Sequence, residues 1–148
     1  MGALDQRQRL LLRAGFALLA ITPAWIGIWG TVAPHAFYRQ FPGAGHHWVP
    51  VLGPYDEHLV RDFASANLGL LALVVFAAVV LERRLVQGAL LAYAIAGIPH
   101  LAYHVATIDH FKTSDAIGML AGLALNVVLP LAMLSLTRAP VRYSGEAV

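Results

Sequence analysis

The stretch LLALVVFAAVVLERRLVQGALLAYAIAG, residues 70–97, decides the fold of this chain. Two apolar runs meet there at Glu82-Arg83-Arg84, and they extend on either side to about 60–81 and 86–108. A helix needs roughly 20 apolar residues to cross the ~30 Å hydrocarbon core of a bilayer, and both runs reach that length. The stretch therefore predicts two membrane-spanning helices joined by a tight hairpin.

Two further apolar runs, at about 12–33 and 115–137, are long enough to span as well. The first exceeds the ~7–15 apolar residues of a signal peptide. It also carries Trp25 and Trp29, so we interpret it as a retained helix. Ser114 is the predicted N-cap of the last helix. The sequence thus predicts an all-α fold in one domain, residues 1–148: a four-helix transmembrane bundle with helices at about 12–33, 60–81, 86–108 and 115–137.

The composition agrees with a membrane protein and excludes several other classes. Of the 148 residues, 59% are hydrophobic and 12% charged, and the mean hydropathy is +0.67. Soluble domains have about 45–50% apolar and about 25% charged residues, so the lipid bilayer is the expected surrounding. The chain has no cysteine, which excludes disulfides, thiolate metal sites and cysteine nucleophiles. The pI is about 9.3, but the basic residues lie scattered at segment ends, so no nucleic acid partner is expected.

The basic residues also predict the orientation, because cytoplasmic segments carry the excess of lysine and arginine. The expected cytoplasmic side holds seven of them and the other side three: Arg7, Arg9, Arg13, Arg83, Arg84, Arg138 and Arg142 against Arg39, Arg61 and Lys112. We therefore expect a multi-pass protein of the plasma membrane with both termini in the cytoplasm. The connection 34–57 becomes a long first extracytoplasmic loop, in which HAFYRQF (35–41) is expected to form a short helix at the membrane interface.

Polar residues gather at the expected outer side, and GPYDEHLVRDF (53–63) is the densest group. At 100° per residue, one face of the second spanning helix carries His58, Arg61, Asp62 and Ser65. The spacing also predicts i,i+4 pairs of Glu57 with Arg61 and of His58 with Asp62.

The third spanning helix carries a matching stripe of Tyr93, His100 and His104, and Pro99 removes a backbone donor beside it. The second and third helices are antiparallel neighbours, so the two stripes lie at the same depth. We expect them to face each other and to form a polar pocket in the outer half of the bundle.

Three functions fit such a pocket. The first is binding of a metal ion, a haem or a lipid-soluble ligand. His100 and His104 have the i,i+4 spacing of helical metal ligands, and His58 and Asp62, or Glu57, complete a nitrogen and oxygen shell. A haem held by two histidines of different helices, with His58 as one of them, is the other cofactor considered.

The second function is acid–base catalysis on an isoprenoid-, quinone- or sterol-like molecule. His58, Asp62 and His100 would transfer protons and Arg61 would stabilise a developing anion, while Glu57, Ser65, Tyr93 and His104 would contact the ligand. The third is an accessory subunit of a larger membrane complex, or a homo-oligomer packed through the Gly118-x-x-x-Gly122 motif.

A purely structural interpretation stands beside these functions. Histidines and acids near helix ends often anchor the interface or cap helices, which applies to His35, His46, His47, Asp109 and His110. Glu57 and Arg61 can equally form a structural ion pair. The sequence also leaves open whether His46 and His47 cover the pocket or lie in solvent.

The segments FPG (41–43), HHWV (46–49), GPYDEHLVRD (53–62) and PHLAYH (99–104) resemble a group of small four-helix membrane proteins that is widespread in actinobacteria and distantly DoxX-like. The resemblance covers nearly the whole chain, most clearly residues 41–104. It implies the four-helix fold and brings no established reaction, although the DoxX link implies quinone-coupled redox work by analogy. Asp56 stands where the group often has Asn, which argues against an essential role for it. The residues that the resemblance singles out are Glu57, His58, Arg61, Asp62, His100 and His104.

Overall fold

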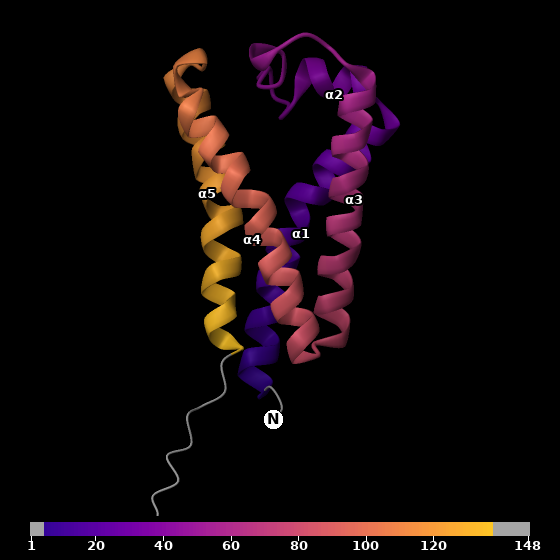
Figure 1. The fold of residues 1–148 in the computed structure, drawn as a ribbon, viewed down its shortest axis with the longest axis vertical. Coiled ribbons are helices and arrows are strands. Elements are labelled where there is room, and N and C mark those ends of the chain that lie inside the picture. Colours follow the sequence, from indigo (N-terminus) through magenta and orange to yellow (C-terminus); the bar gives the residue numbers. More distant parts are fainter. Residues whose placement is uncertain (1–4, 138–148) are drawn as a thin grey trace, which may run out of the picture.

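Four long helices dominate the computed structural model, which describes residues 5–137. They are α1 (Gln6–Val32), α3 (Glu57–Val80), α4 (Arg83–Ala106) and α5 (Thr113–Leu136), and each is long and apolar enough to cross a membrane. The short α2 (Pro34–Gln40) and two 3-10 turns, Pro50–Leu52 and Ile108–His110, lie in the connections, and residues 5–137 contain no strand. The predicted all-α four-helix bundle is confirmed (Figure 1), and α2 coincides with the short helix expected at 35–41.

The outer surface of the bundle is apolar along all four long helices. Each of them turns large aliphatic side chains outward, with exposed fractions of 62–70% in the four examples Ile21, Val79, Ile95 and Ile117. A water-soluble protein rarely exposes so much contiguous apolar surface, whereas lipid tails accept it at no cost. The chain is therefore a small multi-pass integral membrane protein.

The helices begin two to six residues before the predicted positions because polar N-caps extend them beyond their apolar runs. Asp5, Asp56 and Glu82 precede α1, α3 and α4, and each carboxylate accepts a hydrogen bond from a backbone N–H three residues later. Such caps satisfy donors that a helix start leaves without partners. Hydropathy alone does not detect these polar first turns.

The start of α5 differs from the prediction. The N-cap position is Lys112, without a side-chain cap, and the expected cap Ser114 lies inside the first turn. The hairpin between α3 and α4 is confirmed and is tighter than expected. Leu81 ends α3 in the left-handed conformation at φ 53°, Glu82 caps α4, and Arg83 already belongs to that helix.

The four long helices form two pairs, because α3 packs chiefly along α1 and α4 chiefly along α5. We call the end of the bundle with the α3–α4 connection the hairpin end and the opposite end, with α2, the loop end. The pairs meet closely in the half near the hairpin end, around Phe16, Val74, Leu90 and Met133. Towards the loop end α4 and α5 lean away from α1 and α3 (Figure 1), where a second cluster joins α1, α2 and α3.

The hairpin end is tied by hydrogen bonds to the last carbonyls of α5. Gln8 Nε2 donates to the carbonyl of Leu136 (3.0 Å), and Arg83 Nε donates to that of Thr137 (2.5 Å). These carbonyls have no partner within their own helix, and a cation there suits the negative end of the helix dipole. The start of α1 and the end of α5 thus lie at the hairpin end of the bundle (Figure 1). Five described basic residues lie at this end: Arg7, Arg9, Arg13, Arg83 and Arg84. Arg138 and Arg142, which also supported the predicted orientation, lie outside the described residues.

A side chain of α4 replaces a backbone hydrogen bond that is missing inside α1. In a regular helix the N–H of residue 23 would donate to the carbonyl of Leu19, but Pro23 has no N–H. Tyr93, only 4% exposed, donates its hydroxyl to that carbonyl at 2.8 Å. The hydroxyl also lies 3.3 Å from Asn126 Oδ1 of α5, which contacts Thr22. Tyr93 is therefore a core residue that holds α4 against α1, and its contact with a ligand stays a prediction.

Candidate functional site

Glu57 and Arg61 join the loop end of α3 to α1. Arg61 Nε donates to Glu57 Oε1 at 2.8 Å, as the i,i+4 spacing predicted. Arg61 Nη1 donates to the carbonyl of Thr31 at 3.0 Å, next to the last residue of α1. A guanidinium in that position satisfies a free carbonyl and suits the helix dipole. This geometry matches the structural ion pair that was one of the two interpretations of these residues.

His58 and Asp62 form the second expected pair, but they point away from the bundle. His58 Nε2 lies 3.3 Å from Asp62 Oδ2, and their side chains are 88% and 63% exposed. The buried residues Val60 and Ala64 turn α3 towards α1, and positions 58 and 62 lie roughly 160° around the helix from Val60. The expectation that this stripe faces the histidines of α4 is thereby corrected. Ser65, also exposed, donates to the carbonyl of Asp62 at 3.0 Å.

His100 and His104 lie in direct contact in the loop-end half of α4, and we call them the histidine pair. Their Nε2 atoms are 3.0 Å apart, and both residues are half-buried. Three aromatic rings surround the pair. Phe63 of α3 lies 5.9 Å from the His100 ring, centroid to centroid, while Tyr103 and Phe111 lie 5.5 and 6.1 Å from that of His104. Phe63 thus brings α3 to the histidine pair although the two helices diverge at this end.

The four predicted metal ligands are divided into two pairs. Within residues 5–137, no group of three or more His, Cys, Asp or Glu side chains gathers closely enough to hold a metal ion. The cause is the pairing of the helices: α3 follows α1, α4 follows α5, and His58 and Asp62 lie on the outer face of α3. The same separation applies to a haem held between His58 and a histidine of α4.

The contact between the two Nε2 atoms restricts what they can carry. A separation of 3.0 Å is a hydrogen-bond distance, so one nitrogen donates and the other presents its lone pair. Two N–H groups pointing at each other would repel. His104 Nδ1 is buried and has no hydrogen-bond partner among the described residues. The histidine pair can therefore share one proton or, if both Nε2 atoms present lone pairs, one cation.

The long connection between α2 and α3 reaches across the loop end to α5. His46 Nδ1 lies 2.5 Å from Asp115 Oδ1, in the first turn of α5. The ring of Trp48 packs beside Gly118, where a Cβ would meet it at 3.7 Å. His47 remains in the connection, where its Nδ1 bonds the carbonyl of Arg39 at 2.6 Å. His46 and Trp48 thus tie the connection to α5.

Sequence reasoning missed three residues of this region. Phe63 and Phe111 complete the aromatic surround of the histidine pair, and Asp115 holds His46. His46 and Asp115 are 69 positions apart, so no local spacing links them. Phe63 does carry a signal, because it is a large aromatic side chain one position after Asp62 at the expected depth of His100.

Comparison of the chain with protein-family models, with curated proteins and with solved structures finds no match. The resemblance to DoxX-like proteins stays a prediction, and the site is argued from the residues of this chain.

Proposed function

We propose that this membrane protein binds one transition-metal ion between His100 and His104. The observation that carries the proposal is the convergence of the two Nε2 atoms at 3.0 Å on successive turns of α4. With metal–nitrogen bonds of ~2.0–2.1 Å, two nitrogens 3.0 Å apart make an N–metal–N angle of about 90°. A tetrahedral N–metal–N angle would need the two nitrogens to be about 3.4 Å apart. Right angles between nitrogen ligands are typical of the square-planar and tetragonal geometries of Cu(II) and Ni(II). The distance therefore favours Cu(II) or Ni(II) over a tetrahedral zinc site.

The proposed site has open coordination positions. Two histidines supply two ligands, and the remaining positions fall to water or to a bound molecule, since no third ligating side chain stands beside them in residues 5–137. Structural metal sites are closed by protein ligands, whereas sites that exchange or activate a ligand keep positions open. We further propose that the loop end lies outside the cytoplasm, because five of the eight described basic residues lie at the hairpin end.

The test is a titration of the purified full-length chain, without a histidine tag and in chelator-free detergent, with CuCl2 or NiCl2. We expect one ion per chain and a Cu(II) electron paramagnetic resonance spectrum with coupling to two nitrogens. Each of His100→Ala and His104→Ala should weaken binding at least about tenfold, because each removes half of the protein ligands. His58→Ala and His110→Ala are the matched controls and should leave the affinity unchanged. Binding that survives in the His100→Ala/His104→Ala double variant would contradict the proposal.

A second candidate is binding of a lipid-soluble molecule, with acid–base chemistry at the histidine pair. The aromatic surround of Phe63, Tyr103 and Phe111 favours it, because aromatic side chains pack well on a flat ring and imidazoles hydrogen-bond a polar head. Mass spectrometry of molecules that copurify with the chain tests it. A quinone-, sterol- or isoprenoid-type molecule retained without added metal, and lost in His100→Ala, would favour this candidate over the metal.

The third predicted role, an accessory subunit, has a different signature. A stable larger complex in a pull-down that persists in His100→Ala would support it, because such a role does not need the histidine pair.

A further inference from the structure

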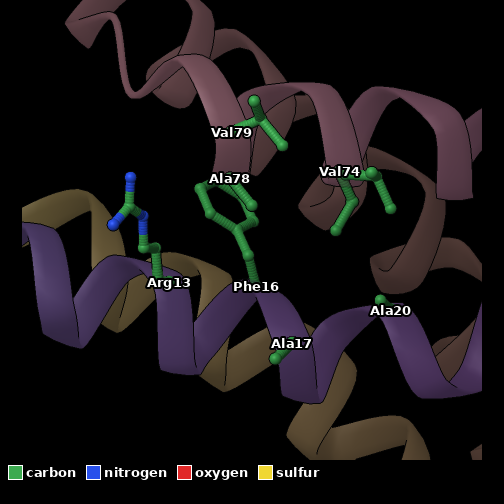
Figure 2. Close-up of a pocket in the computed structure, with 8 residues that line it drawn as sticks. Arg13, Phe16, Ala17, Ala20, Val74, Ala78 and Val79 are labelled. Carbon is green, nitrogen blue, oxygen red and sulfur yellow. The ribbon is translucent and has the colours of Figure 1, made fainter.

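A groove on the outer surface joins α1 and α3 in the half of the bundle near the hairpin end, and we call it the Arg13 groove. Its volume is about 370 Å³, and Arg13, Ala17 and Ala20 of α1 line one side while Val74 and Ala78 of α3 line the other. Figure 2 shows these residues around the space between the two helices. The groove exists because Ala17, Ala20 and Ala78 have side chains too small to fill the space between α1 and α3.

Phe16 also belongs to the lining of the groove, and its completely buried side chain fills the space beneath the floor. In Figure 2 it projects from α1 towards α3, between Arg13 and Ala17. The floor and the walls are therefore apolar, and the only ionisable side chain in the lining is the guanidinium of Arg13.

The groove runs along about two thirds of the hydrocarbon thickness of one leaflet. From position 13 to position 20, α1 rises ~10 Å. One leaflet contributes about half of the ~30 Å hydrocarbon core. Arg13 lies at the end nearer to the start of α1, and Ala20 lies nearer to the middle of the helix. A charged end followed by an apolar channel of this length has the polarity of a phospholipid.

Arg13 has no hydrogen bond or ion pair with any residue in the described range 5–137. The described carboxylates at the hairpin end are Asp5 and Glu82, and both accept backbone hydrogen bonds as helix caps. A cation within a spanning helix is costly unless it reaches an anion or the interface. Because the guanidinium carries five donors in a planar fork, a phosphate group is a well-matched partner.

We infer that a phospholipid of the surrounding leaflet occupies the Arg13 groove, with its phosphate on the Arg13 guanidinium and one acyl chain along Ala17 and Ala20. The small alanine side chains let the acyl chain pack closely against both helices, and the guanidinium selects a lipid that carries a phosphate. The inference is independent of the histidine pair, which lies in the opposite half of the bundle.

Native mass spectrometry of the full-length chain in detergent tests this, with phosphatidylglycerol and with a diacylglycerol of the same acyl chains as probes. Wild type should bind one phosphatidylglycerol more tightly than the diacylglycerol. Arg13→Gln should weaken phosphatidylglycerol binding at least about tenfold and leave diacylglycerol binding unchanged, since it removes only the charge-assisted bond. Ala17→Leu should weaken binding of both lipids, because it fills the channel.

Two control variants match these changes. Arg84→Gln removes an exposed arginine at the same end, and Ala102→Leu enlarges an exposed alanine of α4. Neither should change lipid binding. The inference is overturned if Arg13→Gln and Arg84→Gln have equal effects, or if Ala17→Leu leaves both affinities unchanged. A concentration-dependent dimer that Ala17→Leu abolishes would also overturn it, because a second copy would then occupy the groove.

Discussion

The bond between Tyr93 and the carbonyl of Leu19 gives a quantitative test of how α1 and α4 hold together. The hydroxyl donates at 2.8 Å from a side chain that is 4% exposed, and Pro23 leaves the carbonyl without a donor of its own helix. Loss of such a bond leaves a buried acceptor without a partner, which lowers the stability of a protein by ~1–3 kcal/mol. Hydrogen bonds between membrane helices average ~0.6 and reach about 1.7 kcal/mol. We therefore expect Tyr93→Phe to lower the free energy of unfolding by about 1–2 kcal/mol.

The mechanism predicts a coupling between two positions. Pro23→Ala supplies an N–H to the carbonyl of Leu19, so the acceptor stays satisfied when the hydroxyl of Tyr93 is removed. Tyr93→Phe should then cost less in the Pro23→Ala background than in wild type, by at least about 0.5 kcal/mol. Because the cycle compares differences, the effect of Pro23→Ala alone, which also alters a buried ring, cancels.

The measurement is reversible unfolding in mixed micelles by increasing SDS, followed by far-ultraviolet circular dichroism. Tyr103→Phe, at a tyrosine that is 51% exposed, is the control and should have little effect. If the two substitutions are additive within about 0.3 kcal/mol, the carbonyl of Leu19 does not depend on Tyr93 and the reasoning fails.

Two further perturbations test the packing and the caps in the same unfolding assay. Gly27→Ala should destabilise the chain by about 1–3 kcal/mol, because a Cβ there would lie 2.8 Å from a Leu68 side-chain carbon; Gly88→Ala, which meets nothing within 4 Å, should stabilise it by about 0.5–1 kcal/mol, and equal effects at both positions would contradict the close α1–α3 contact. Backbone N–H groups at the start of α4 hold the pKa of the Glu82 carboxyl below its ordinary value. The charged carboxylate therefore stabilises the fold above its ordinary pKa and loses this effect as the pH falls through the lowered pKa. Glu82→Gln should make the melting temperature less sensitive to pH in that window, and an unchanged pH profile would refute the role of the cap.

The four spanning helices could be predicted from the sequence because length and hydropathy are local properties. Which helix packs on which is not local, and the assumption that neighbours in the chain face each other was wrong for α3 and α4. Glycines at the contacts explain the difference. Gly27 and Gly30 of α1 let Leu68 and Ala64 of α3 approach so closely that a Cβ on either glycine would lie 2.8 Å from them. Close contacts of this kind set the pairing of membrane helices, and they depend on residues far apart in the chain.

Only the part of the candidate site that lies on a single helix could be predicted, because contacts between helices are not local in the sequence. Periodicity correctly placed His58 with Asp62 and His100 with His104, since each pair lies on one helix. It could not tell towards which neighbour each face turns, and the structure separates the pairs. Tyr93 shares the stripe of His100 by angle but lies deeper, against α1. One signal for its role was available, because a proline inside a spanning helix leaves a carbonyl that needs a donor from elsewhere.

The pairing of α1 with α3 and of α4 with α5 has a consequence for biogenesis. The first pair is complete in the chain at Val80, before α4 begins at Arg83. Its two helices can therefore meet in the bilayer while the second half of the protein is still in the ribosome. The second pair, α4 and α5, follows after a short connection. Its hydrogen bonds to α1, from Tyr93 to the Leu19 carbonyl and from Gln8 to the Leu136 carbonyl, form last. Within each pair, the second helix is the next spanning helix to be made after the first. The main contacts of each pair can therefore form as soon as its second helix has been synthesised.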